Sequence, residues 1–240
     1  MDLTAAVITL GSFVAAWVNA SFATGGVYFV IAACSAVIPL GVTVPLQPAL
    51  VYSSLGARIA FFRRHICWPI VLTFTSGSAI GVFLGARLFV RLSESLLSLI
   101  IGGTLLLLTW TPRLKLRLSV QHLFFPIGIV HSFLSTLFAI TPVLQVAIFR
   151  TSLLKLQIVS TLAACFFFQE SLRMIGYAVN GFDYGSYLPL ILFSNIAGIA
   201  GTWTGKRTSH LISEATFRLL FRWLMTAIAL RLLYRAWLLA

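Results

Sequence analysis

Long apolar runs follow one another along the whole chain, and the lysines and arginines stand mainly at their ends. Of the 240 residues, 60% are hydrophobic and only 9% are charged, whereas an ordinary soluble domain has about 25% charged residues. In lipid, only helices and closed barrels satisfy the backbone hydrogen bonds. Because the runs lack the strict alternation of barrel strands, the sequence predicts an all-α polytopic membrane protein.

The net charge of +12 comes from 17 Lys and Arg against 5 Asp and Glu. In a soluble protein this excess would indicate nucleic acid binding. Here the basic residues flank apolar runs singly or in twos and threes, as residues do that set orientation and contact lipid headgroups. We therefore expect membrane lipids among the partners and no nucleic acid. Cys34, Cys67 and Cys165 lie far apart inside apolar segments, which predicts core packing and no metal site or disulfide framework.

The sequence resembles itself after a shift of half its length. Ser12-Phe13 then matches Ser132-Phe133, and Pro69 matches Pro189. A longer block follows in the same register, in which Gly81, Gly85, Arg87 and Ser93-Glu94 match Gly201, Gly205, Arg207 and Ser213-Glu214. Paired repeats of this size are typical of secondary transporters. We expect two repeats, residues 1–120 and 121–240, which together form one transport domain.

The apolar runs predict 8–10 helical segments. They lie near 5–22, 25–40, 46–62, 67–90 and 95–111, and near 122–139, 142–150, 157–179, 186–206 and 215–238. No basic region precedes the first run, which predicts a retained helix and not a cleaved signal peptide. A very short break separates the opening pair of each repeat. Since a spanning helix needs about 20 residues, segment 142–150 is too short, and each pair is expected to be a hairpin or a broken helix inside the membrane.

The positions of the basic residues favour inverted over parallel repeats. If each opening pair of segments enters the membrane and returns to the same side, the two repeats have opposite orientations. Most basic residues then fall on the inner side of the membrane. This inside set is Arg58, Arg63, Arg64, Arg113, Lys115, Arg117, Arg150, Lys155, Lys206, Arg207, Arg218 and Arg222. Arg87, Arg91, Arg231 and Arg235 then fall outside. Parallel repeats would divide the basic residues evenly between the two sides.

Two parts of the repeated block have structural interpretations. The spacing of Gly81 with Gly85, and of Gly201 with Gly205, is the pattern that lets two helix backbones approach closely. Ser93-Glu94 and Ser213-Glu214 have the residue types of a helix N-cap and a first-turn acid. We assign none of them chemistry.

These features resemble the TauE/SafE family of sulfite-exporter-like permeases. The resemblance lies in the break at residues 19–26, the Pro-rich stretch 44–54, the basic-aromatic turn 61–68 and the glycine block, and in the second half in Thr141-Pro142, Ser160-Thr161 and residues 198–207. It implies a multi-pass protein of a bacterial inner membrane that exports small sulfur-containing anions such as sulfite or organosulfonates. A homodimer is compatible with it.

Polar residues at the two breaks form the predicted substrate site. Such groups are costly in a membrane and therefore tend to be functional, and a helix that starts there points N–H groups at an anion. The candidates are Asn19, Ser21, Thr24, Gly25 and Gly26 at the first break, Thr141 and Gln145 at the second, with Ser132, Ser135 and Thr136 before it, and Ser53, Ser54, Ser160 and Thr161 one helix onward. The alternative is that these groups only cap helices and form hydrogen bonds within them.

Glu170 and Arg173 stand three residues apart in segment 157–179, so they share a helical face and can form an ion pair. Arg173 could also attract the anion, which makes it the last candidate for substrate binding. Glu170 and His131 are the candidates for proton coupling. With Glu170 held by Arg173, we expect electrogenic efflux driven by the membrane potential, with proton coupling as the alternative.

The chain has no motif of a serine hydrolase, zinc protease, membrane aspartate pair or nucleotide-binding loop. We therefore expect neither an enzyme nor a cofactor. Two alternatives to sulfur-anion export remain open. One is transport of another small organic anion, such as a carboxylate, and the other is a membrane assembly protein without transport activity.

Overall fold

The computed structural model describes residues 3–22, 25–110, 123–139, 141, 143–208 and 214–238. Within these ranges the chain is helical and contains no strand, so the prediction of an all-α fold is confirmed. Thr24 lies outside the described residues, as do Arg113, Lys115, Arg117 and Ser213.

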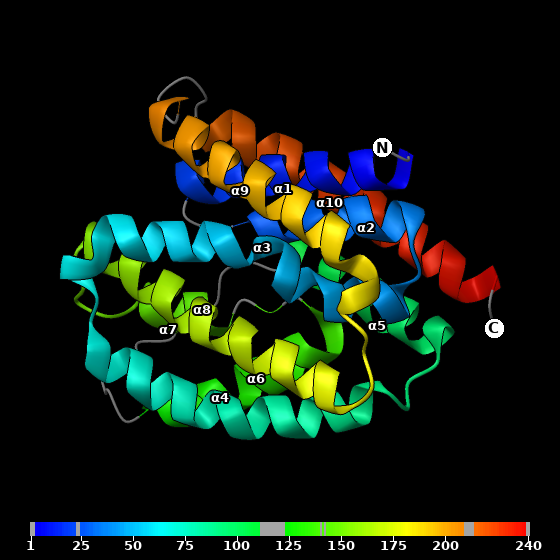
Figure 1. The fold of residues 1–240 in the computed structure, drawn as a ribbon, viewed down its shortest axis with the longest axis horizontal. Helices are drawn as coiled ribbons and strands as arrows, with labels where there is room; N and C mark the ends of the chain where they lie inside the picture. Colours follow the sequence, from blue (N-terminus) through cyan, green and yellow to red (C-terminus); the bar gives the residue numbers. More distant parts are fainter. Residues whose placement is uncertain are drawn as a thin grey trace.

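Each half of the chain has the same order of helices (Figure 1). The first half contains α1 (Leu3–Phe22), α2 (Gly26–Val37), α3 (Leu40–Phe62), α4 (Trp68–Phe89) and α5 (Glu94–Trp110), with the 3-10 turn η1 (Arg63–His65) before α4. The second contains α6 (Phe124–Phe138), α7 (Val143–Ile148), α8 (Lys155–Val179), α9 (Leu188–Thr208) and α10 (Glu214–Leu238), with η3 (Gly185–Tyr187) before α9.

Helix α3 begins six residues earlier than the apolar run predicts, at Leu40, and contains both Pro45 and Pro48. A proline inside a helix removes an N–H donor and frees the carbonyl four residues earlier. At Pro48 that carbonyl belongs to Val44, and it accepts a hydrogen bond from Arg173 Nη2 at 3.4 Å. Arg173 of α8 thus supplies a hydrogen-bond partner for the carbonyl that Pro48 frees.

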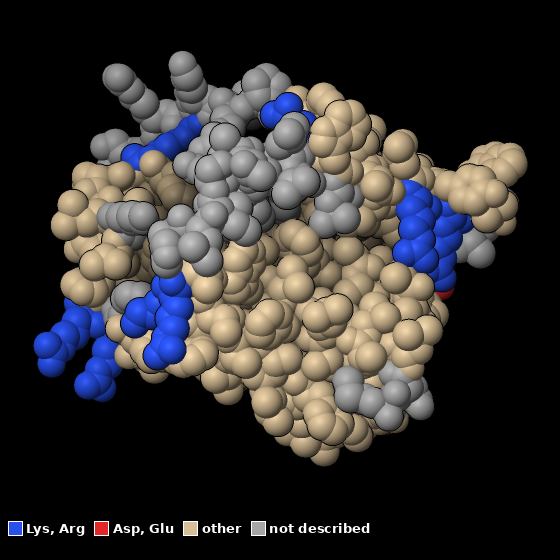
Figure 2. Space-filling view, turned by 90° about the horizontal axis from the view of Figure 1, so that it is seen from above, with Lys and Arg blue, Asp and Glu red and all other residues tan. Residues whose placement is uncertain are grey.

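Four described segments are long and apolar enough to cross a membrane: Leu3–Ser21, Trp68–Phe89, Leu156–Val179 and Gly185–Thr208. Their outward faces carry large exposed hydrophobic side chains, such as Leu72 and Phe83 on α4 and Ile196 on α9. On the face drawn in Figure 2, most visible Lys and Arg side chains lie toward the left and right edges, with a broad uncharged area between them. Such a surface suits lipid better than water.

Glycines bring α4 against α6 and α1 against α9. A Cβ atom added at Gly85 would lie 3.0 Å from a backbone oxygen of α6, and one at Gly205 would lie 2.6 Å from a backbone oxygen of α1. Gly81 and Gly201 face the same two helices just as closely. The four glycines are therefore packing residues, as their spacing predicts. A shift of half the chain's length relates α4 to α9 and α1 to α6, so the two helix pairs are equivalent in the two repeats.

The opening helices of each half fold back as hairpins. Gly11 of α1 lies against Ala33 of α2, since a Cβ at Gly11 would meet the Ala33 Cβ. In the second half, His131 of α6 contacts the start of α7 through a hydrogen bond from the Leu144 N–H. Of the two expected arrangements, the hairpin is therefore the one observed. Helices α3 and α8 pack against each other between the outer helices (Figure 1).

The predicted cap of α5 is present. Ser93 Oγ accepts the Leu96 N–H at 3.3 Å, and Glu94 occupies the first turn. Glu94 also accepts the Leu40 N–H at 3.2 Å and lies 2.8 Å from Arg235 Nη2 of α10. The first-turn acid thus also ties the start of α3 to α10. The matching side chain of Glu214 lies outside the described residues.

Candidate functional site

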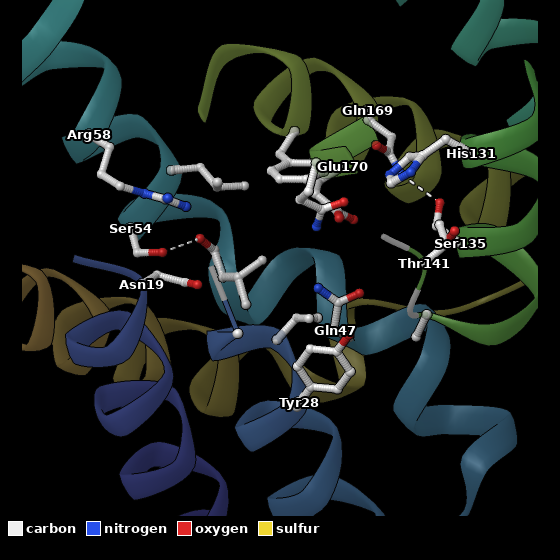
Figure 3. A pocket seen from close by; sticks show the side chains of 17 residues that line it. Asn19, Tyr28, Gln47, Ser54, Arg58, His131, Ser135, Thr141, Gln169 and Glu170 are labelled. Carbon is white, nitrogen blue, oxygen red and sulfur yellow. Dashed lines mark hydrogen bonds between the residues drawn. The ribbon is translucent and has the colours of Figure 1, made fainter. Parts of the chain in front are cut away.

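A cavity of about 70 Å³ lies where the two hairpins approach α3 and α8 (Figure 3). Both halves line it: Asn19, Gly25, Val27 and Tyr28 from the first hairpin, Gln47, Val51, Ser54, Leu55 and Arg58 from α3, His131, Ser135, Ala139, Thr141 and Gln145 from the second hairpin, and Phe166, Gln169 and Glu170 from α8. A volume of this size admits several water molecules. The two breaks therefore open on one common space.

Asn19 holds the first break in shape. Its Oδ1 accepts the Gly26 N–H at 2.8 Å, so it caps the start of α2. Gly25 adopts a left-handed conformation, with φ of 100°, which favours glycine. A Cβ at Gly26 would collide with the backbone oxygen of Ala15. Asn19 and Gly25 line the cavity, but the Gly26 N–H already has a protein partner.

Ser21, another candidate at the first break, does not line the cavity. Ser21 Oγ donates to the backbone oxygen of Gly205 on α9 at 3.3 Å, which places it in a helix contact. Thr24 lies outside the described residues.

His131 has the same role at the second break as Asn19 has at the first. Its Nδ1 accepts the Leu144 N–H at 3.1 Å, near the start of α7, so the Nε2 atom carries the proton of a neutral ring. The ring lies between those of Phe74 and Phe166, with centroids 5.7 and 5.8 Å away. In both halves, a side chain of the first hairpin helix thus accepts an N–H at the start of the second.

Thr141 and Gln145 line the cavity from the second hairpin. Ser135 lines it as well, and its Oγ accepts a hydrogen bond from Gln169 Nε2 at 2.5 Å. Ser132 and Thr136 are fully buried within α6, where Thr136 donates to the Ser132 carbonyl at 2.6 Å.

The four hydroxyls one helix onward separate into different roles. Ser54 lines the cavity. The hydroxyls of Ser54 and Ser160 each donate a hydrogen bond to the carbonyl three residues earlier. Ser53 Oγ donates to the Asn195 carbonyl at 2.8 Å, which joins α3 to α9. Thr161 Oγ1 accepts the backbone N–H just before α4 at 3.0 Å. Of these four, Ser54 is the one on the cavity lining.

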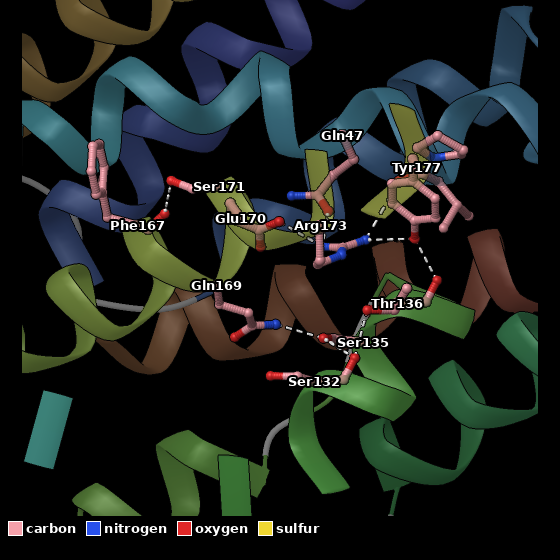
Figure 4. Close-up of polar contacts among 12 residues, drawn as sticks. Gln47, Ser132, Ser135, Thr136, Phe167, Gln169, Glu170, Ser171, Arg173 and Tyr177 are labelled. Atoms are coloured by element: carbon pink, nitrogen blue, oxygen red, sulfur yellow. Dashed lines mark hydrogen bonds and ion pairs between the residues drawn. The ribbon is translucent and has the colours of Figure 1, made fainter. Parts of the chain in front are cut away.

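Glu170 and Arg173 form the expected ion pair, with 2.7 Å between Arg173 Nη1 and Glu170 Oε2. The same Nη1 donates to Gln47 Oε1 at 2.8 Å, and Nη2 lies 3.4 Å from the Tyr177 hydroxyl. Tyr177 in turn donates to the Thr136 carbonyl (Figure 4). Arg173 is fully buried and does not line the cavity, whereas Glu170 does. Arg173 is therefore placed to neutralise and orient Glu170, with no path to a ligand in this conformation.

Arg58 is the residue on which the sequence interpretation and the structure differ most. The sequence interpretation placed Arg58 at the inner side of the membrane, among the basic residues that set orientation. The structure leaves it only 5% exposed, one turn before the end of α3, with its guanidinium directed into the cavity (Figure 3). It forms no ion pair and no hydrogen bond with the described residues, and its Nε is buried without a partner. Its position within segment 46–62, and not at its end, was the available signal.

Among the described residues, no group of three His, Cys, Asp or Glu side chains is placed to hold a metal ion. The cysteines are unpaired, with Cys34 and Cys165 buried and Cys67 partly buried.

The apolar outward faces, together with a polar cavity that both hairpins line, define an integral membrane protein of the transporter class. The chain belongs to the sulfite exporter TauE/SafE family, whose model matches residues 8–232. This confirms the resemblance that the sequence motifs indicate, and the members of this family are transporters. No curated protein and no solved structure matches the chain.

Proposed function

We propose that the protein exports small sulfur-containing anions, such as organosulfonates or sulfite, from a bacterial cell across its inner membrane. The cavity between the hairpins is the substrate site, and two inverted repeats give it alternating access. The observation that carries the proposal is the convergence of both breaks on one cavity. Family membership supplies the substrate class.

The charge of the lining supports an anionic substrate. Arg58 contributes a positive charge that has no counterion among the described residues, while Arg173 offsets the charge of Glu170. Asn19, Ser54 and other amide and hydroxyl side chains surround the same space. Hydrogen bonds between such groups and an oxyanion are strong when one partner is ionised. A cation in the cavity would be repelled by the guanidinium of Arg58.

The helix contacts support a two-fold relation between the repeats, and the positions of the basic residues favour inverted ones. The hairpin helix α1 packs on α9 of the other half, and α6 packs on α4 in the same way. Such an exchange is expected when two repeats are related by a two-fold axis, either in the membrane plane or along its normal. Two bundles result, each with a hairpin of one repeat and a helix of the other. Rocking of these bundles about α3 and α8 would open the cavity to one side at a time.

Flux through proteoliposomes tests the proposal. Vesicles that contain the purified full-length chain are loaded with ethanesulfonate, sulfite, thiosulfate or acetate, and efflux is compared with that from protein-free vesicles. We expect saturable efflux of ethanesulfonate or sulfite. Efflux of acetate alone would support the carboxylate alternative and contradict the sulfur substrate. Vesicles that release none of these anions faster than the protein-free control would contradict anion transport.

A further inference from the structure

We propose that Arg58 binds the anionic head of the substrate directly, and that the site selects monoanions with a short apolar group, such as alkanesulfonates. This inference rests on the proposed function and names the substrate class of the same cavity.

The first argument is the burial of Arg58 without a partner. An isolated ionised side chain is costly to remove from water, so buried charges are normally paired. Arg58 is 95% buried, yet it has no hydrogen bond or ion pair among the described residues. Its guanidinium points into the cavity (Figure 3). A planar guanidinium can bind two oxygens of one sulfonate at once, so the missing partner is supplied by the ligand.

The second argument is the charge balance of the cavity. The carboxylate in its lining is Glu170, which Arg173 neutralises at 2.7 Å. His131 accepts a hydrogen bond at Nδ1 and is therefore a neutral ring. The described lining thus offers one uncompensated positive charge, that of Arg58. One negative charge on the ligand balances it, whereas a second would be buried without a counterion and close to Glu170.

The third argument is the apolar part of the lining. Val51, Ser54, Leu55 and Arg58 all line the cavity, and their spacing of three and four residues places them on one face of α3. Phe166 adds an aromatic surface from α8. A ligand whose head contacts Arg58 and Ser54 can therefore lay a short alkyl chain beside Val51 and Leu55. Inorganic sulfate has no such group to bury.

Calorimetric titration of the detergent-purified full-length chain tests both parts of the proposal, with ethanesulfonate and sulfate as ligands. We expect the wild type to bind ethanesulfonate more tightly than sulfate. Arg58→Gln should weaken ethanesulfonate binding by about 10- to 100-fold, since it removes hydrogen bonds to a charged group. Arg58→Lys keeps the charge but not the planar guanidinium, so its affinity for ethanesulfonate should lie between that of the wild type and that of Arg58→Gln. The matched control is Arg63→Gln in η1, an exposed arginine, which should bind as the wild type does.

Thermal unfolding separates ligand binding from a structural role of Arg58. Without ligand, Arg58→Gln should melt at or above the wild-type temperature, because it removes a buried charge that has no partner. Ethanesulfonate should raise the melting temperature of the wild type and of Arg63→Gln, but not that of Arg58→Gln. A ligand-free Arg58→Gln protein that melts well below the wild type would identify a structural role and overturn the proposal.

The remaining outcomes distinguish this inference from the proposed function. If the wild type transports sulfur anions and Arg58→Gln binds ethanesulfonate as well as the wild type, direct binding by Arg58 is wrong and the proposed function stands. If sulfate binds more tightly than ethanesulfonate, selection of monoanions is wrong. If the wild type neither binds nor transports any anion, the proposed function itself is wrong.

Discussion

Arg173 and Glu170 form an ion pair inside the molecule, with 2.7 Å between Nη1 and Oε2, and the arginine is fully buried. Gln47, Tyr177 and the Val44 carbonyl satisfy three further contacts of the guanidinium. The carboxylate faces the cavity while its counterion stands behind it. The pair therefore sets the charge of the cavity without exposing Arg173 to a ligand.

Removal of one partner of this pair should cost more stability than removal of both. Arg173→Gln leaves the carboxylate of Glu170 buried and unpaired, which should lower the free energy of unfolding by about 3–5 kcal/mol. The double variant Glu170→Gln/Arg173→Gln leaves no buried charge at this position and should recover part of that loss. Melting temperatures in detergent measure the effect. Equal melting temperatures for the single and double variants would contradict the role given to the pair.

Gly81 tests the packing of α4 on α6. A Cβ at Gly81 would collide with the backbone oxygen of Ile129, so Gly81→Ala should force the helices apart and cost about 1–3 kcal/mol. Gly103 in α5 is the matched control, because a Cβ there meets nothing within 4 Å. Gly103→Ala should be neutral or stabilise by about 0.4–1 kcal/mol. A Gly81→Ala protein as stable as the Gly103→Ala protein would show that the close approach is unnecessary.

Labelling from the two sides of the membrane tests the inverted orientation. Arg64 follows α3 and Asp183 follows α8, and both are exposed. Single cysteines at these positions, in a Cys67→Ser background, should react with an impermeant maleimide from opposite sides. Cys34 and Cys165 are buried and should remain unlabelled. Reaction of both introduced cysteines from the same side would contradict inverted repeats and favour parallel ones.

Several parts of the structure could be predicted because they depend on short-range pattern or composition. The scarcity of charge excludes an aqueous surface, and the lack of strand-like alternation in the apolar runs then predicts helices. Glu170 and Arg173 pair because three residues separate them on a helix. The glycines of α4 and α9 pack closely because their spacing leaves a smooth helix face. Each of these predictions needed no knowledge of which helices meet.

The cavity lining could not be predicted, because it depends on how distant helices meet. Ser53 and Ser54 are adjacent in sequence, yet one contacts Asn195 of α9 while the other lines the cavity. Arg173 satisfied the pattern expected of an anion ligand but is enclosed by protein contacts. Arg58 lies within segment 46–62, one turn before its end, and the packing of α3 and α8 with the two hairpins is what directs it into the cavity. Local pattern gave the residue types of the site, and tertiary packing selected among them.

We infer the energy source of transport from the few acidic groups. Glu170 is held by Arg173, Glu94 is paired with Arg235, and Asp183 is exposed and accepts hydrogen bonds from its own turn. The described part of the chain therefore contains no unpaired carboxylate in the cavity lining to carry a coupling proton. An inside-negative potential already expels an anion, with a free energy of about 2.3 kcal/mol per charge per 100 mV, which corresponds to a concentration ratio of about 50-fold. We expect electrogenic efflux without a coupled ion.

Proteoliposomes loaded with ethanesulfonate measure this directly. A potassium diffusion potential, negative inside and imposed without a pH gradient, should accelerate efflux, and reversal of its sign should slow efflux. The double variant Glu170→Gln/Arg173→Gln lacks the candidate coupling carboxylate but keeps the charge of the cavity balanced, so it should retain the response to potential. Proton coupling through Glu170 predicts the opposite pattern. In that case efflux would follow the pH gradient, ignore the potential and disappear in the double variant, and the uncoupled mechanism would be wrong.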